Sequence, residues 1–140
     1  MRVFTTLPMG DWRAVAPFAA AAEAAGFDGL MTVELAHDPF APLGLAALAT
    51  RRAGLTASVA VAFPRSPTIG AAQAWDLHTN SGGCFVLGLG SQVKGHNERR
   101  FASRGARRRP DLKTISGRCA RCGDAGPPES ASITAERAIS

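Results

Sequence analysis

The chain has 140 residues and a formal net charge of +5, and this length allows one domain with a single modest core. Residues 1–98 hold six Lys or Arg and seven Asp or Glu, whereas residues 99–140 hold ten and four, so the basic character belongs to the last part of the chain. No apolar run approaches the roughly 20 residues of a membrane span, and Asp11 and Arg13 come too early for a signal peptide, so we expect a cytoplasmic protein with no membrane partner.

Apolar, β-branched segments alternate with Ala-rich segments that carry helix signals at their ends. Asp11 can cap the first helix, and Gly26 stands where that helix should end. Pro17 should kink this helix or mark a second start. Ser66 and Pro67 suit the first positions of the third helix. We predict strands at 2–6, 29–33, 55–63 and 85–89, and helices at 12–25, 42–52 and 67–80.

This strand–helix alternation repeats about every 30 residues and continues as far as Phe101. Such an order is typical of parallel strands joined by crossover helices. A doubly wound sheet and a (β/α)8 barrel both have it, and the spacing alone does not choose between them. A full barrel takes roughly 250 residues, so residues 1–101 could supply about half of its strands.

The fourth predicted strand lies within NSGGCFVLGLGSQVKGHNE (80–98) and is followed directly by polar residues. Gly88 and Gly90 leave space near its carboxyl end, which suits either a ligand that approaches the backbone or close packing within a barrel. In parallel α/β proteins, ligands bind at the carboxyl ends of the strands. We therefore place the candidate site there.

Three segments, AAEAAGFDGLMTVE (21–34), SVAVAFPRSP (58–67) and SGGCFVLGLGS (81–91), together span three βα units. They resemble the N-terminal half of the luciferase-like monooxygenases, and most of all the branch that uses the deazaflavin coenzyme F420. The resemblance covers residues 1–101. It implies an α/β fold that is the N-terminal half of a (β/α)8 TIM barrel, with about four parallel βα units.

The resemblance implies that the loop after the second strand lies near the ring of the cofactor. Its matching residues are Glu34 and His37, with Asp38 beside them, and Glu34 and His37 are the predicted catalytic residues. Histidine exchanges protons near neutral pH, which suits a proton donor beside the ring. Without the resemblance, Glu34 would be interpreted as a solvated carboxylate at a strand end and His37 as an ordinary loop residue.

The resemblance also implies a non-proline cis peptide bond in the third strand, behind the ring. The matching pair is Ser58–Val59, with Ala60 and Val61 as the alternative position. The family's polar residue at the edge of the ring corresponds to Asn97. Ser58, Val59, Ala60 and Asn97 are thus the predicted contacts of coenzyme F420 or, alternatively, of FMN.

Other charged and sulfur-containing residues receive simpler interpretations. The family usually has Arg where this chain has Cys84, so an ion pair that serves stability should be lost. Arg65 and Lys94 could meet an anionic cofactor tail, but surface charge is the simpler interpretation. Cys119 and Cys122 lack the further ligands that zinc requires, so we expect no metal site.

Residues 102–140 are rich in Arg and contain few large apolar side chains, which predicts a disordered basic tail without strands or helices. Such a composition is typical of a GC-rich gene read out of frame. We hypothesise a frameshift near codon 101; another frame of the DNA should then encode a fifth barrel strand. The Arg run at 107–109 could hold phosphates, but the tail has no aromatic side chains that stack on bases, so we expect no nucleic-acid partner.

These features predict a truncated oxidoreductase. The resemblance implies a parent activity of hydride transfer or monooxygenation of a small organic substrate, with coenzyme F420 or reduced FMN. Half of a barrel leaves open sheet edges, so we expect little or no catalysis unless two copies close one barrel as a homodimer. The alternative is a non-catalytic fragment or a basic-tailed nucleic-acid-binding module, which would show salt-sensitive DNA binding that is lost without residues 102–140.

Overall fold

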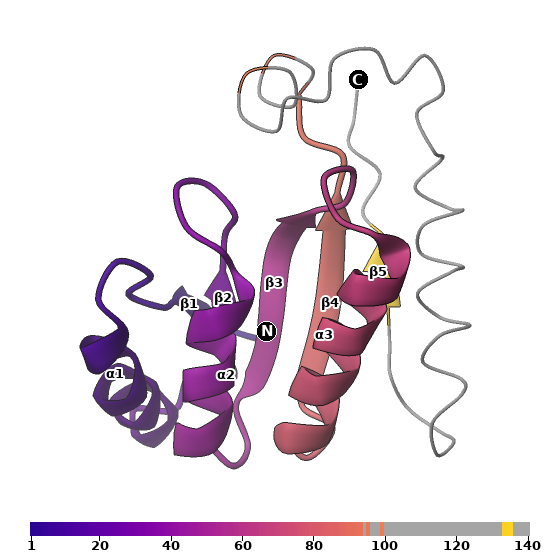
Figure 1. Cartoon of the computed structure of the whole chain (residues 1–140). Coiled ribbons are helices and arrows are strands. Elements are labelled where there is room, and N and C mark those ends of the chain that lie inside the picture. The colour runs from indigo at the N-terminus through magenta and orange to yellow at the C-terminus, as the bar shows by residue number, and fades with distance from the viewer. Residues whose placement is uncertain (94, 96–98, 100–132, 136–140) are drawn as a thin grey trace.

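The computed structural model describes residues 1–93, 95, 99 and 133–135, and its main elements are one parallel sheet and three helices (Figure 1). The sheet order is β1-β2-β3-β4-β5, and every neighbouring pair is parallel. The alternation predicted from the sequence is therefore confirmed. The strands are β1 (Phe4–Thr6), β2 (Gly29–Thr32), β3 (Gly54–Val61), β4 (Phe85–Gly90) and β5 (Ile133–Ala135), and the helices are α1 (Trp12–Ala24), α2 (Phe40–Ala49) and α3 (Pro67–Asn80).

The helices cover one face of the sheet. Helices α2 and α3 lie side by side on it, and α1 packs next to α2 (Figure 1). Leu30, Leu55 and Leu87 belong to the core and are at most 1% exposed. On the opposite face, Thr56 is only half-buried and Ser58 is exposed. A doubly wound sheet has helices on both faces, so this one-sided cover is the arrangement of a (β/α)8 barrel, and the predicted half-barrel fold is confirmed.

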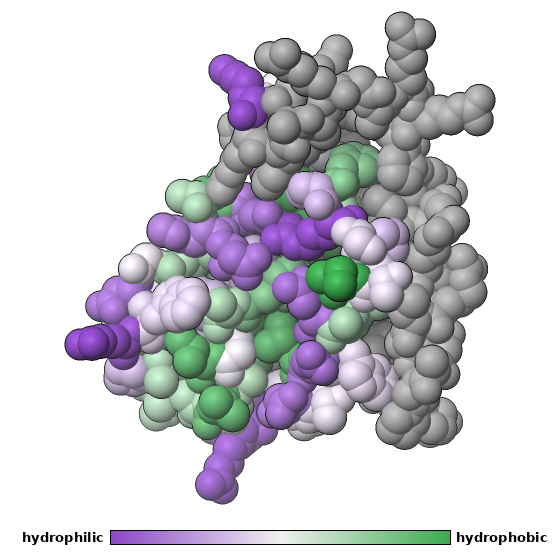
Figure 2. Space-filling view, viewed as in Figure 1, coloured by the Kyte–Doolittle hydropathy of each residue, from purple (hydrophilic) through white to green (hydrophobic). Residues whose placement is uncertain are grey.

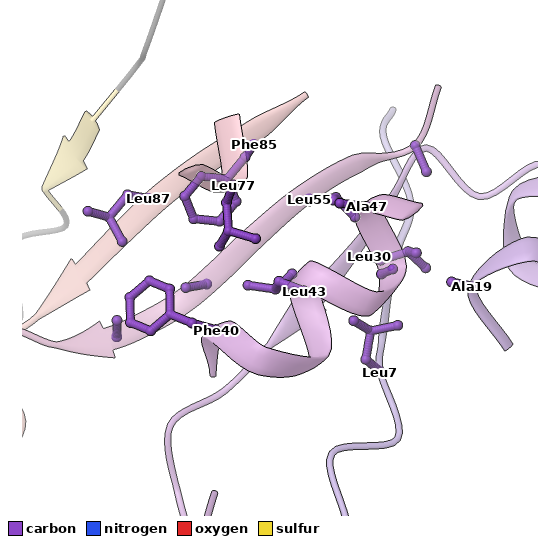
Figure 3. Packing of buried hydrophobic residues seen from close by; sticks show 14 of the residues in the cluster. Leu7, Ala19, Leu30, Phe40, Leu43, Ala47, Leu55, Leu77, Phe85 and Leu87 are labelled. Carbon is purple, nitrogen blue, oxygen red and sulfur yellow. The ribbon is translucent and has the colours of Figure 1, made fainter. Parts of the chain in front are cut away.

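The hydrophobic core lies between the sheet and its helices (Figure 3). Leu43 of α2 is fully buried and faces the strands, and Leu77 of α3 packs near Phe85 of β4. Burying one such side chain stabilises the fold by roughly 1.5–3 kcal/mol relative to leaving it in water. The core therefore holds each helix to the sheet and fixes where the loops after the strands begin.

Local sequence signals act as predicted at both ends of α1. Asp11 caps α1, since its Oδ1 accepts a hydrogen bond from the Arg13 N–H at 3.0 Å. Gly26 follows the helix with a φ of +91°, a conformation that favours glycine. Helix α1 continues through Pro17 as one element, so no second helix start occurs there. Ser66 occupies the N-cap of α3, although its side chain makes no capping hydrogen bond.

The last strand corrects an expectation about the tail. Residues 133–135 form β5, which pairs with β4 in parallel through Leu87↔Ile133 and Leu89↔Ala135. The prediction that no strand follows Phe101 is therefore wrong at these residues. The outer edge of β4 offers unpaired N–H and C=O groups, and a short segment with β-branched residues can pair with them. The other residues of the predicted tail lie outside the described part of the chain.

Glu23 on α1 anchors the segment that leads into β3. Its carboxylate accepts hydrogen bonds from three successive backbone N–H groups: Arg51 at 3.1 Å, Arg52 at 2.8 Å and Ala53 at 2.8 Å. These bonds, led by the one from Arg52, hold the pKa of Glu23 below its ordinary value. The carboxylate therefore connects α1 to the segment between α2 and β3 as long as it is ionised.

This lowered pKa predicts how stability should depend on pH. A carboxyl group with a lowered pKa in the folded state stabilises the fold above its unfolded pKa, which is about 4.3 for Glu. The contribution is lost as the pH falls through that value and then through the lower folded-state value. We expect Glu23→Gln to reduce the acid-induced fall in the free energy of unfolding, measured by urea titrations across this pH range. Identical pH profiles for the two proteins would contradict the anchor.

The surface seen in Figure 2 mixes apolar and polar residues in small patches. The exposed large apolar side chains include Trp12, Leu48 and Ile69, which are 59%, 81% and 57% exposed and belong to different helices. Among the described residues, no helix has the length and apolar character to cross a membrane.

Candidate functional site

The loops after β2 and β3 meet at the carboxyl end of the sheet. Because β2 and β3 are parallel neighbours, the residues that follow them lie at the same end. Glu34, which follows β2, contacts Val61 at the end of β3 and Arg65 in the loop after it. This is the region in which the sequence predicted the site. The contacts within it, however, differ from those expected.

Glu34 is a buried carboxylate, 6% exposed, and not a solvated one. Its Oε2 accepts hydrogen bonds from the Val61 backbone N–H at 2.6 Å and from Arg65 Nη1 at 2.5 Å. Its own backbone N–H donates to Val59 O at 3.4 Å. Side chain and backbone both attach Glu34 to β3, so it lies directly beside the Ser58–Val59 pair.

Arg65 connects the two loops, and its interpretation as a surface charge is wrong. Its Nη1 also donates to Val61 O at 3.0 Å, and its Nη2 donates to Asp38 Oδ2 at 3.1 Å. The guanidinium carbon is 5.2 Å from the centre of the Phe40 ring, and the side chain is 17% exposed. Carboxylates from the neighbouring loop enclose this charge. The spacing of residues within a single segment does not reveal a contact of this kind, because it joins two segments.

Asp38 fixes the loop between β2 and α2. Its Oδ1 accepts hydrogen bonds from the backbone N–H groups of Phe40 at 2.9 Å and Ala41 at 3.4 Å, where α2 begins. Its Oδ2 meets Arg65. The loop is also held from inside, because the buried Thr32 hydroxyl donates to Pro39 O at 3.0 Å. The loop that carries Glu34 and His37 is therefore attached at several points.

The peptide bond between Ser58 and Val59 is cis, at the pair that the resemblance indicated. It coincides with a register shift between β3 and β4, which lies between Ala57 and Ala60. Ser58 is exposed on the face of the sheet opposite the helices, whereas Ala60 is fully buried in the core. The side chain in this group that remains open to a ligand is that of Ser58.

Gly88 and Gly90 serve close packing within the sheet. A Cβ on Gly88 would lie 2.4 Å from Ala57 O, and one on Gly90 would lie 2.4 Å from Val59 Cγ2. The space that these glycines leave is thus occupied by β3 of the same chain. Of the two interpretations open at the sequence level, close packing is the one that the contacts support.

Among the described residues, His37 is not joined to this network. His37 is exposed, and a Cβ on Gly10 would lie 3.8 Å from its Nε2, so it borders the loop after β1. Its ring makes no hydrogen bond with Glu34 in the part of the chain that the structure describes. Asn97 lies outside the described residues. The sequence placed His37 in the site, whereas Arg65 was interpreted as a surface charge. The available signal for Arg65 was a basic residue in a strand-end loop next to an acidic one.

At the opposite end of the sheet, Cys84 lines an open cavity of about 560 Å³ with Arg2, Asp28 and Arg52. No ion pair reaches Asp28 among the described residues; its carboxylate accepts a hydrogen bond from the Val3 N–H at 2.7 Å. Within the same residues, no group of three or more His, Cys, Asp or Glu side chains could hold a metal ion.

The fold and the position of the site define the first part of a (β/α)8 barrel with its candidate site at the carboxyl ends of the strands. The model of the luciferase-like monooxygenases matches residues 3–114, and the chain belongs to this family. The match extends beyond Phe101, where the resemblance was expected to end.

Two proteins of Mycobacterium tuberculosis are similar in sequence. An uncharacterized protein is 52% identical over 84 residues, which are 60% of this chain and 25% of that protein. A second protein, with the provisional name coenzyme F420-dependent oxidoreductase, is 36% identical over 119 residues, covering 78% of this chain and 34% of that protein. The chain thus spans about a quarter to a third of the length of these relatives.

Two solved structures show the same fold at low sequence identity. The coenzyme F420-dependent tetrahydromethanopterin reductase of Methanopyrus kandleri has a TM-score of 0.60 and 23% identity, over 70% of this chain and 28% of that one. The oxygenating constituent of 3,6-diketocamphane monooxygenase of Pseudomonas putida, in complex with FMN, has a TM-score of 0.66 and 16% identity, over 87% and 38%.

Proposed function

We propose that this chain provides the first half of a flavin- or deazaflavin-binding site. The activity would be hydride transfer or monooxygenation of a small organic substrate, with coenzyme F420 or reduced FMN. One observation carries the proposal: in a member of this family, a buried carboxylate, Glu34, is held at the carboxyl rim by Arg65 and the Val61 N–H. Ligands bind at this rim in (β/α)8 barrels.

The open face beside the cis peptide bond suits a planar ring. Gly88 has no side chain, Ser58 has a small, exposed one, and the Val59 side chain lies against Gly88 and Gly90, so none of these residues carries a large side chain. We assign Ser58 and Val59, with the backbone of Ala60, to the support of the ring. Asn97 is proposed at the edge of the ring by its place in the sequence alone.

When bound, the cofactor would supply the redox chemistry, and the protein would supply orientation and electrostatics. Glu34 would accept a hydrogen bond from the ring or the substrate. His37, exposed at the border of the loops after β1 and β2, would exchange a proton with the substrate. Both residues would thereby act at the reacting face, opposite the support given by β3.

A substitution that blocks the proposed platform tests where the cofactor binds. We expect Ser58→Phe to abolish saturable binding of coenzyme F420 and of FMN to the full chain, measured by cofactor fluorescence, because the added ring would occupy the proposed platform. Thr68→Phe is the matched control, since Thr68 is also exposed but lies on α3. Circular dichroism would confirm that both variants fold. Equal binding by the two variants, or none by the unmodified chain, would contradict the proposal.

A further inference from the structure

Arg65 donates three hydrogen bonds to protein acceptors, two in the loop after β2 and one at the end of β3. Its Nη1 donates to Glu34 Oε2 and Val61 O, and its Nη2 donates to Asp38 Oδ2. A guanidinium presents its donors in a rigid plane, so it can hold acceptors from different segments in one relative geometry. These contacts favour a role toward other residues of the protein over one toward an anionic cofactor tail.

The two carboxylate oxygens of Glu34 have different surroundings. Oε2 accepts both hydrogen bonds, whereas Oε1 has no partner in the described part of the chain. It is not fully buried either, because the only fully buried side-chain nitrogen or oxygen without a hydrogen-bond partner among the described residues is Gln73 Oε1. Oε1 is therefore the acceptor that a bound molecule can reach, and the partners of Oε2 determine its direction.

We propose that Arg65 is a positioning residue that holds Oε2 of Glu34 and so presents Oε1 to the ring-binding site. The inference rests on the proposed function, since it assumes that a ring binds at this rim. Without Arg65, the Val61 N–H alone would hold the carboxylate, and Asp38 would lose its connection to the loop after β3. Arg65 thus acts through Glu34 and does not touch the cofactor.

A double-mutant cycle on FMN affinity tests this relation. We expect Arg65→Met and Glu34→Gln each to weaken binding by roughly tenfold, the effect of losing one charge-assisted hydrogen bond. If Arg65 acts through Glu34, the double variant should also bind about tenfold more weakly; independent roles would give roughly a hundredfold loss and overturn the proposal. Arg51→Met is the matched control, because Arg51 is exposed and meets Glu23 only through its backbone N–H.

Riboflavin distinguishes positioning from direct phosphate binding, because it has the ring of FMN without the phosphate. We expect Arg65→Met to weaken riboflavin and FMN binding by the same factor. A loss confined to FMN would show that Arg65 binds the phosphate group and would contradict the positioning role. Arg65→Lys should restore most of the affinity for both probes, since one ammonium group can still hold Oε2.

The Val61 amide tests the positioning separately from cofactor binding. Its N–H donates to Glu34 Oε2 at 2.6 Å, so its proton resonance should lie downfield in an NMR spectrum of the full chain. We expect Arg65→Met to move this resonance upfield and Arg65→Lys to restore it. An unchanged resonance would overturn the role of Arg65. Failure of the unmodified chain to bind either probe would overturn the proposed function, and with it the presentation of Oε1 to a ring, but not the hold of Arg65 on Oε2. Arg65→Gln replaces Arg65→Met should the latter not fold.

Discussion

Replacing Gly88 with Ala is expected to lower the free energy of unfolding by about 3 kcal/mol, the upper end of the usual cost of overpacking. The new methyl group would lie 2.4 Å from Ala57 O, a backbone atom of β3 that cannot move without disturbing the sheet. To relieve this clash, β3 and β4 would have to move apart next to the Ser58–Val59 pair. Urea denaturation followed by circular dichroism measures the loss.

Gly44→Ala is the control for this substitution. A Cβ on Gly44 would meet nothing closer than Leu77 Cδ2 at 3.9 Å, and the residue lies inside α2. Alanine is the better helix former, so this variant should be more stable by about 0.5–1 kcal/mol. Opposite signs for the two Gly→Ala substitutions are the expected result. A Gly88→Ala variant as stable as the unmodified chain would mean that β3 and β4 do not pack this closely.

Replacing Glu34 with Ala is expected to cost about 2–3 kcal/mol of stability, below the full cost of breaking a buried ion pair because the remaining Arg65 is partly reached by water. The substitution leaves the guanidinium and the Val61 N–H without their acceptor. Glu34→Gln keeps the shape and an acceptor oxygen and should cost about half as much. Thermal or urea denaturation distinguishes the two variants.

Asp76→Ala is the control for the loss of a carboxylate. Asp76 is exposed on α3; its backbone oxygen accepts a hydrogen bond from Asn80 Nδ2, and its carboxylate makes none with the described residues. Exposed substitutions of this kind usually change stability by less than about 0.5 kcal/mol. If Glu34→Ala were equally harmless, the carboxylate would not be the connection between the loops that the structure describes.

The elements and their order could be predicted from the sequence because their signals are local. Asp11 and Gly26 mark the ends of α1 through contacts within a few residues, and the apolar runs of the strands are continuous. The place of the site followed as well, since parallel strands bring their carboxyl ends together. The position of the Ser58–Val59 bond was predicted from the resemblance to the family and is confirmed. The role of Asn97, the disorder of the tail outside residues 133–135 and the homodimer stay predictions.

What the sequence by itself determined about this protein is the alternating α/β pattern, the family and the rim at which function should be sought. Only the tertiary structure decided that Arg65 joins Glu34 to Asp38, that Val59 fills the space beside Gly90, and that residues 133–135 pair with β4. The physical reason is distance along the chain. Capping and periodicity act between near neighbours, whereas Arg65 lies 31 residues from Glu34 and 27 from Asp38, and their contact exists only once β2 and β3 are paired.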